Sequence, residues 1–395
     1  MKRDLFIASA FLCVLASCSK NDVDEPKTIS SFSLTANIEQ PQLDTKADLN
    51  ASFQTLWASG DVLKVHITNG AGDWSTDQPF TLSSGEGSTS GTFHCGTAYS
   101  ATDHWDLCAF FPYNYTSSTG ADNTGSNVGG DSKMYFNLPE SYYEYTSGQS
   151  FLPLLANMSG GSTHPASVSL KHVGGAVVVN LTKVPGAAKS LGMTIDGKNI
   201  TGWMNGVTPT DAGTASGIIT SSSGSNSTIW LNFDSSGSVD RSFQFIYPVP
   251  TISSTSDITF KMYDKNDLLI WKKTASGQSA IGRAKALVMP NKAVAPIPQN
   301  MYLVGYINGA DNNIGYAFNN ATGSVSGIEI TENSYVCLRA DDTGDWYMTD
   351  AYVGSGNTAT VKCQSGEKLL VPAGTYTFSM AYQSDGSIVL SYESE

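Results

Sequence analysis

The sequence predicts an all-β protein made of tandem β-sandwiches. Short segments with alternating apolar and polar residues recur along the chain, and clusters of Gly, Asn, Asp and Ser separate them. No long apolar repeat with a helical period interrupts this pattern. The composition agrees, since the 395 residues include 38 glycines and only 14% are charged. A chain of this length predicts two or three domains.

The N-terminus predicts export and a lipid anchor. Lys2 and Arg3 precede an apolar run at 5–16, and residues 15–18 are Leu-Ala-Ser-Cys. This order indicates a signal peptide over 1–17 that ends in a lipobox, with Cys18 carrying acyl chains such as palmitate. The alternative is an ordinary signal peptide with a chance cysteine. The apolar run is too short to span a bilayer. Residues 18–28 are acidic and predict a solvated tether to the outer membrane.

The first predicted strand alternates strictly and is followed by a basic residue. We expect its four apolar side chains to face one way, because successive residues of a strand point to opposite faces: Phe32, Leu34, Ala36 and Ile38. A trypsin-like protease could cut between Lys46 and Ala47. Such a cut would free the strand and leave a gap where another strand docks. The alternative is that the strand never leaves its sheet.

Further strands follow in order along the chain. Residues 53–67 contain Trp57, a Gly-Asp turn and a strand in which His66 is a surface residue. Segments 92–95, 105–113 and 152–156 complete the first unit, and a second unit opens at Ser167. Its Gly174-Gly175 pair inside a strand predicts a bulge or a close backbone approach. Six more segments of the second unit have strand character: 191–195, 229–233, 243–249, 258–263, 268–272 and 286–289.

Four cysteines remain after Cys13 leaves with the signal peptide and Cys18 is lipidated. They form two local pairs, Cys95 with Cys108 and Cys337 with Cys363. Each pair could close a disulfide between neighbouring strands in an oxidising compartment, or all four could be buried thiols. A zinc site at residues 94–108 is disfavoured because the spacing contains no tight ligand pair, so we expect no metal.

Charge and motif content exclude several function classes. The formal net charge is −13, which argues against nucleic acid and anionic lipid surfaces as partners. The chain has no G-x-S-x-G, no H-E-x-x-H and no phosphate-binding glycine loop. We therefore expect a protein that is not an enzyme and has no cofactor.

The order of several short motifs resembles the fimbrillin (Mfa-like, FimA-like) family of Bacteroidales type V pili. The motifs after the early strand are Trp-x-x-Gly-Asp at 57–61, Ala-Phe-Phe-Pro-Tyr at 109–113, Leu-Lys-His at 170–172 and Pro248 after an aromatic strand. The resemblance implies two transthyretin-like β-sandwich domains, at 29–160 and 161–296. It also implies a lipoprotein anchored at Cys18, a cut after Lys46, and a partner subunit whose donor strand replaces residues 32–38. The family's cut follows arginine, whereas this chain has lysine.

The last unit, at 299–395, changes character. Its opening Met-Tyr-Leu-Val-Gly at 301–305 and its closing strands at 369–380 and 387–392 resemble the C-terminal domains of SusE and SusF, which are glycan-binding surface lipoproteins. Sugars are recognised by flat aromatic faces together with carboxylates or amides. The candidate glycan-binding residues are Tyr306, Asp345, Trp346, Tyr347 and Tyr352. The alternative is that the aromatic residues simply cover the core.

Two functions remain from the sequence. One is a pilus subunit in the fimbrium, and the other is a stand-alone surface lipoprotein that binds a host or dietary glycan. Because the chain ends at Glu395, inside or just after a predicted strand, little tail remains to donate to a neighbour. A subunit that accepts a strand and gives none belongs at a filament end. We therefore expect a tip-type adhesin.

Overall fold

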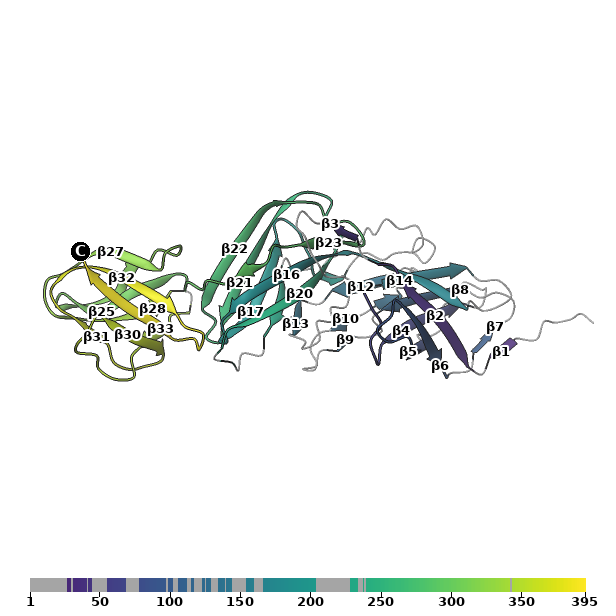
Figure 1. Ribbon diagram of the computed structural model, residues 1–395, viewed down its shortest axis with the longest axis horizontal. Helices are drawn as coiled ribbons and strands as arrows, with labels where there is room; N and C mark the ends of the chain where they lie inside the picture. The colour runs from purple at the N-terminus through teal and green to yellow at the C-terminus, as the bar shows by residue number, and fades with distance from the viewer. Residues whose placement is uncertain are drawn as a thin grey trace, which may run out of the picture.

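The protein is an elongated row of three β-rich parts (Figure 1). The computed structural model describes residues 27–29, 31–40, 42–44, 55–68, 78–96, 99–101, 106–111, 115–116, 123–124, 126–128, 134–138, 140–143, 154–159, 166–203, 228–233, 237, 239–341 and 343–395. Every regular element in these ranges is a strand, which confirms the all-β class. None of the described residues forms a helix with the length and hydropathy of a membrane span.

The first part is a closed barrel around an aromatic core. The strands follow the order β14 (Leu154–Ser159), β15 (Ser167–His172), β2 (Phe32–Ile38), β6 (Ser90–Cys95), β5 (Gln78–Ser84), β4 (Val62–Thr68) and β8 (Asp106–Phe111). Edge-to-face ring contacts join Trp57 to Phe93 at 4.7 Å and to Phe111 at 5.3 Å. Closure removes open sheet edges, so the barrel depends on every one of its strands.

One sequence-predicted boundary is wrong at β15. We expected Ser167 to open the second unit, but β15 pairs with β14 and β2 and completes the barrel. The second part begins at the Gly174-Gly175 pair, since its strand β16 starts at Gly175. The predicted close approach there is confirmed, because a Cβ on Gly174 would lie 2.3 Å from the Val249 carbonyl oxygen, and one on Gly175 would lie 2.4 Å from Ile281.

The second part consists of two facing sheets. One follows the order β20 (Arg241–Val249), β16 (Gly175–Val184), β23 (Lys285–Val288) and β3 (Gln42–Asp44), with β24 (Lys292–Ala293) beside β16. The other follows β13 (Ser141–Tyr143), β19 (Thr228–Asn232), β17 (Ala188–Ile195), β21 (Ser256–Asp264) and β22 (Leu269–Gln278). The Tyr247 hydroxyl donates to the Leu191 carbonyl across the core at 3.2 Å.

Smaller ladders accompany the first two parts. β11 (Ser126–Val128), β12 (Met134–Leu138) and β18 (Gly202–Trp203) form a three-stranded sheet. Two pairs are isolated: β1 (Lys27–Ile29) with β7 (Tyr99–Ala101), and β9 (Tyr115–Thr116) with β10 (Asn123–Thr124). Since β13 pairs with β19 and β12 pairs with β18, the first half of the chain contributes to more than the barrel.

The third part is a sandwich whose two sheets are joined at β29 and β30. Its strands are β25 (Met301–Ile307), β26 (Ala310–Ala317), β27 (Ser324–Ile330), β28 (Ser334–Ala340), β29 (Trp346–Met348), β30 (Thr358–Cys363), β31 (Leu369–Val371), β32 (Gly374–Tyr382) and β33 (Ile388–Ser394). The continuous order is β26-β25-β28-β29-β30-β33-β32-β27, and β31 pairs with β28. Side chains such as Leu303, Phe378 and Leu390 fill its core.

The third part is firmly bonded to the second. The Ala187 N–H donates to the Ser384 carbonyl at 2.8 Å, and the Ile297 N–H donates to Ile270 at 2.7 Å. The Tyr382 hydroxyl donates to the fully buried Asp264 carboxyl at 2.9 Å. Burial raises the pKa of Asp264, and the hydrogen bonds from Leu268 and Tyr382 oppose this. Buried residues of the two parts form one continuous hydrophobic core.

The two cysteine pairs do not lie on neighbouring strands, so the predicted disulfides are wrong on this point. β5 and β4 lie between Cys95 on β6 and Cys108 on β8, and β29 lies between Cys337 on β28 and Cys363 on β30. Cys95, Cys337 and Cys363 are free thiols. Proximity in sequence did not mean adjacency in the sheet. Burial raises the pKa of Cys337 to about 11, which favours an inert thiol.

We predict that Leu34→Ala lowers the free energy of unfolding of the barrel by about 2–5 kcal/mol, because Leu34 is fully buried and its loss leaves a cavity. Asn37→Ala on the exposed side of the same strand is the control, with an expected change within about 0.5 kcal/mol. Hydrogen exchange of the neighbouring strands β6 and β15 measures the barrel separately from the other two parts. Equal protection in both variants would contradict the prediction.

Candidate functional site

β2 is a central strand of the barrel with ladder partners on both sides. It runs parallel to β15, with Thr35 opposite Ser167, and antiparallel to β6, with Phe32 opposite Cys95. Its four inward side chains have exposed fractions of 3%, 0%, 0% and 6%, which confirms the predicted alternation. Taking β2 out would therefore uncover two unpaired backbone edges and an apolar groove.

Trp57 forms the floor of the groove under the middle of β2. The Trp57 Nε1–H donates to the Ala36 carbonyl at 3.1 Å. Just after Trp57, a tight turn is closed by the Asp61 carboxylate, which accepts from the Ala58 N–H at 2.7 Å. Gly60 has φ of 83°, a conformation that glycine adopts without strain. The Trp-x-x-Gly-Asp motif thus fixes the indole ring beneath the strand.

The C-terminal end of β2 is held by an ion pair that reaches into the second part. Both Arg283 guanidinium nitrogens, Nη1 and Nη2, donate to the Glu39 carboxylate, with the Nη2 contact at 2.9 Å. The His172 backbone N–H donates to the same carboxylate at 3.1 Å. Burial raises the pKa of Glu39, but the hydrogen bond and charge of Arg283 outweigh it, and the net pKa lies below the ordinary value.

His172 lies beneath this ion pair and is 3% exposed. Burial, partly opposed by the charge of Glu39, lowers the pKa of the imidazole from 6.5 to about 4. Its Nε2 has no hydrogen-bond partner among the described residues. The ring is therefore neutral near pH 7.

After Glu39 the chain continues into the second part. β3 runs parallel to β23, with Leu43 opposite Ala286. The segment from β2 to β3 thus adds one strand to the barrel and one to the neighbouring sheet. The predicted lipidation site Cys18 and the predicted cleavage site at Lys46 and Ala47 lie outside the described residues.

Three exposed tyrosines gather on the third part. Tyr306 on β25 lies directly opposite Tyr335 on β28, and the rings of Tyr335 and Tyr352 have centroids 6.0 Å apart. Their exposed fractions are 41%, 38% and 51%. We call these three residues the tyrosine patch. Tyr306 and Tyr352 were predicted as site residues, whereas Tyr335 was missed because only strand register reveals its partner.

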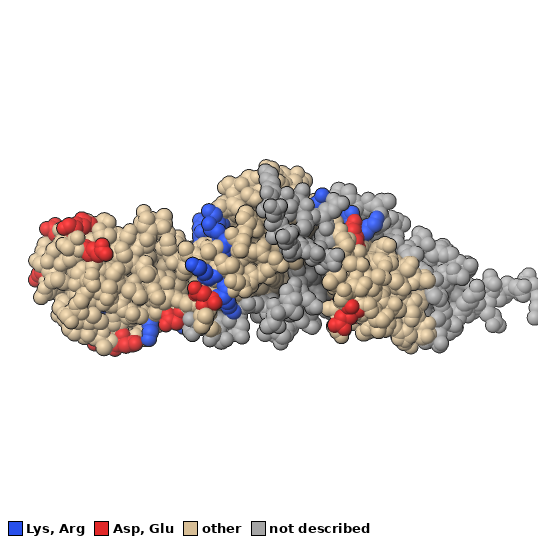
Figure 2. Space-filling model, viewed as in Figure 1, with Lys and Arg blue, Asp and Glu red and all other residues tan. Residues whose placement is uncertain are grey.

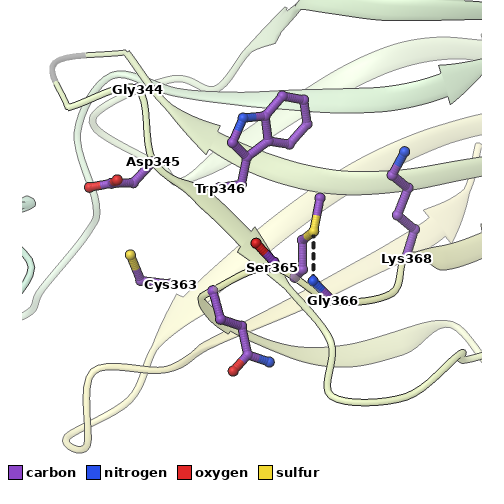
Figure 3. A pocket seen from close by; sticks show the side chains of 9 residues that line it. Gly344, Asp345, Trp346, Cys363, Ser365, Gly366 and Lys368 are labelled. Carbon is purple, nitrogen blue, oxygen red and sulfur yellow. Dashed lines mark hydrogen bonds between the residues drawn. The ribbon is translucent and has the colours of Figure 1, made fainter.

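A pocket of about 630 Å³ lies beside Trp346 on the third part (Figure 3). Asp345, Trp346 and Lys368 are among its lining residues, and the Gly366 N–H donates to the Met348 sulfur at 3.2 Å. Trp346 lies opposite Arg339, which is four residues from Tyr335 on the same strand. The half-buried Trp346 and the tyrosine patch therefore share one face of the sheet.

Tyr347 is misassigned as a glycan contact. It is fully buried and lies opposite Leu338 in the core. Trp346 and Tyr347 are consecutive in a strand, so they point to opposite faces and only one of them can meet a ligand.

Charged groups on the third part are dispersed (Figure 2). Acidic side chains appear at several separate places on the visible face. Within the described ranges, no three His, Cys, Asp or Glu residues come together as metal ligands.

Sequence comparisons identify no relatives, since no family model and no curated protein matches the chain. The similar solved structures include the following three. A candidate cell adhesion protein from Bacteroides fragilis has 8% identity, coverage of 66% of this chain and 92% of that one, and a TM-score of 0.35. One from Bacteroides ovatus has 13% identity, coverage of 63% and 87%, and a TM-score of 0.32. The fimbrial anchor protein Mfa2 from Porphyromonas gingivalis has 11% identity, coverage of 61% and 81%, and a TM-score of 0.30. Similarity at this level does not establish a common family.

We predict that the junction at His172 and Glu39 weakens on acidification. The unfolded imidazole takes up a proton near pH 6.5 while the folded one resists protonation until about pH 4, so stability falls as the pH drops through this window. The loss approaches about 3 kcal/mol. Glu39, with its lowered folded pKa, adds to the loss in the same direction at lower pH. Urea unfolding at pH 7 and pH 4.5 measures the difference.

His172→Gln is the matched variant for this pH dependence. It keeps the backbone N–H that Glu39 accepts from but removes the titrating ring. We expect its stability to change less between the two pH values. The same pH dependence in both proteins would contradict the assignment to His172.

Proposed function

We propose that this chain is a fimbrillin-like pilus subunit that receives a partner's strand in place of β2. The observation that carries the proposal is the position of β2, which is buried in a closed barrel, paired on both sides, and followed eight residues after Ile38 by Lys46, with β3 in between. One cut after Lys46 would separate β2 from the rest of the barrel without breaking any other barrel strand. The remaining groove has the shape and backbone edges that a replacement strand needs.

The forces that hold β2 can hold a replacement equally well. Burial of four apolar side chains contributes about 1.5–3 kcal/mol for each large one, and two ladders of backbone hydrogen bonds fix the register. A donor strand supplied by another subunit offers both. In this proposal Cys18 anchors the precursor in the outer membrane and the processed protein enters the fimbrium.

A position at the filament end is proposed from the third part. β33 pairs with β30 on one side and β32 on the other, so it is committed to its own sheet. A strand in this position is poorly placed to be donated. We therefore propose a tip-type subunit whose third part is its exposed, adhesive end.

We expect limited trypsin digestion of the folded chain to produce a new N-terminus at Ala47 and to permit uptake of a labelled peptide with the sequence of residues 31–45. Fluorescence anisotropy measures uptake, and N-terminal sequencing locates the cut. Lys46→Gln is the control and should remain uncut and take up no peptide. A protein cut after Lys46 that binds no peptide would refute strand exchange.

A second candidate function is glycan binding by the third part, favoured by the tyrosine patch. Exposed aromatic faces without core partners on their outer side suit the apolar face of a sugar ring. Tyr306, Tyr335 and Tyr352 make up three of the five large apolar side chains that are exposed among the described residues. In this second proposal the chain is a surface lipoprotein, and the sugar that it binds is a host or dietary glycan.

We predict that Tyr335→Ala and Tyr352→Ala each weaken glycan binding by about tenfold, since each removes one stacking face. Full-length protein on a glycan array, followed by titration of the best ligand, measures this. Tyr335→Phe and Tyr352→Phe keep the rings and should retain most of the affinity. Trp346→Ala tests whether the adjoining pocket contributes. Unchanged binding in both alanine variants would exclude the tyrosine patch.

A further inference from the structure

The ion pair at the end of β2 joins residues that are far apart in the sequence. Glu39 follows the first barrel strand, whereas Arg283 belongs to the loop before β23 in the second part. Their side chains are 29% and 26% exposed, so the pair lies partly out of solvent. A bidentate guanidinium contact of this kind is directional and selects a carboxylate over other groups.

The loop that carries Arg283 has supports that involve neither β2 nor β3. The Ala284 N–H donates to the Gly174 carbonyl at 2.9 Å, and the Lys285 N–H donates to the Gly282 carbonyl at 3.2 Å. Next along the chain, β23 is held parallel to β16. The close approach of this loop to Gly175 requires the missing side chain, since a Cβ there would meet the Gly282 carbonyl at 2.7 Å.

Ala284 has φ of 53°, which lies in the left-handed region that alanine rarely adopts. This conformation costs free energy, so the surrounding contacts must hold the loop in place. Arg283 therefore keeps its location when the first strand leaves. The His172 N–H likewise belongs to β15, which stays in the barrel.

Removal of the first strand would take Glu39 away and leave two donors aimed at one empty position. The Arg283 guanidinium would lose its bidentate acceptor, and the His172 N–H would lose the carboxylate oxygen it binds at 3.1 Å. Partly buried donors without acceptors are costly. An incoming strand that supplies a carboxylate at this point restores both contacts.

We propose that Arg283 and the His172 N–H form a carboxylate-binding site for an acidic residue of the incoming strand. This acidic residue comes immediately after the last buried residue of that strand. This inference rests on the proposed function and names the partner that the groove accepts. The partner is an extended peptide with alternating apolar residues followed by Asp or Glu. The site gives the exchange a fixed register, because a shift by one residue would move the carboxylate away from Arg283.

The groove adds a size requirement at its third apolar position. Ala36 lies directly opposite Gly91, so the two share one face. A Cβ on Gly91 would already lie 2.7 Å from the Trp57 ring and 2.7 Å from Leu82. Because Trp57 fills the space over this pair, the incoming strand must carry a small residue there. The other three positions hold Phe32, Leu34 and Ile38 and accept large side chains.

Peptides test the site without altering the folded protein. The chain cut after Lys46 is titrated with labelled peptides of residues 31–45 that carry the native sequence, Glu39→Gln or Ala36→Leu. We expect each substitution to weaken binding by about tenfold or more, because the first removes the carboxylate and the second overfills the space under Trp57. An Asn37→Ala peptide is the control, since Asn37 is exposed, and should bind like the native peptide.

Charge exchange provides the matching test on the protein. Arg283→Glu protein should prefer a Glu39→Lys peptide over the native one, whereas Arg283→Lys should keep part of the preference for the native peptide. Equal binding of the native and Glu39→Gln peptides would overturn the carboxylate site and leave strand exchange intact. Failure of every peptide to bind would instead refute strand exchange, and with it this inference.

Discussion

The barrel depends on the pairing of β2 with β15 and β6. These three strands come from residues 32–38, 167–172 and 90–95, so closure brings together segments that are far apart in the chain. The four apolar side chains of β2 are buried in the barrel core, and the two ladders determine the position of the strand. The same strand is also the one barrel strand that lies on the N-terminal side of the predicted cut. The stability of the first part and the strand exchange proposed for it would therefore have one physical origin.

The first and second parts are joined through the segment that follows β2. Glu39 contacts Arg283, and β3 adds to the edge of the sheet that contains β23. In the Glu39–Arg283 contact, only Glu39 is attached directly to β2. The loop that carries Arg283 and the strand β15 have hydrogen bonds of their own. If the proposed cut removes β2, the Arg283 loop and β15 would stay in place, and a replacement strand that supplies a carboxylate could complete the junction again.

Local pattern was enough to predict much of this structure. The alternation at 32–38 gave the inward face of β2, and Gly174-Gly175 indicated the close approach that the structure contains. Pairing over long distances was not predictable, because 244 residues separate Glu39 from Arg283 and nothing local links them. The same limit explains the errors at β15 and at the cysteines. The error at Tyr347 was avoidable. Tyr347 follows Trp346 directly in a predicted strand, and strand alternation places the side chains of consecutive residues on opposite faces of the sheet.

The buried bond between Tyr382 and Asp264 has a mechanical consequence. It lies within a hydrophobic core that the second and third parts share, so bending between these parts would have to break buried contacts. A ligand that pulls on the far end would load these two parts together as a lever whose other end meets the barrel. Tension would then reach β2 and its neighbours with little loss along the way. The force at which the molecule fails would then be determined by the contacts of β2 in the barrel and not by the contacts between the second and third parts.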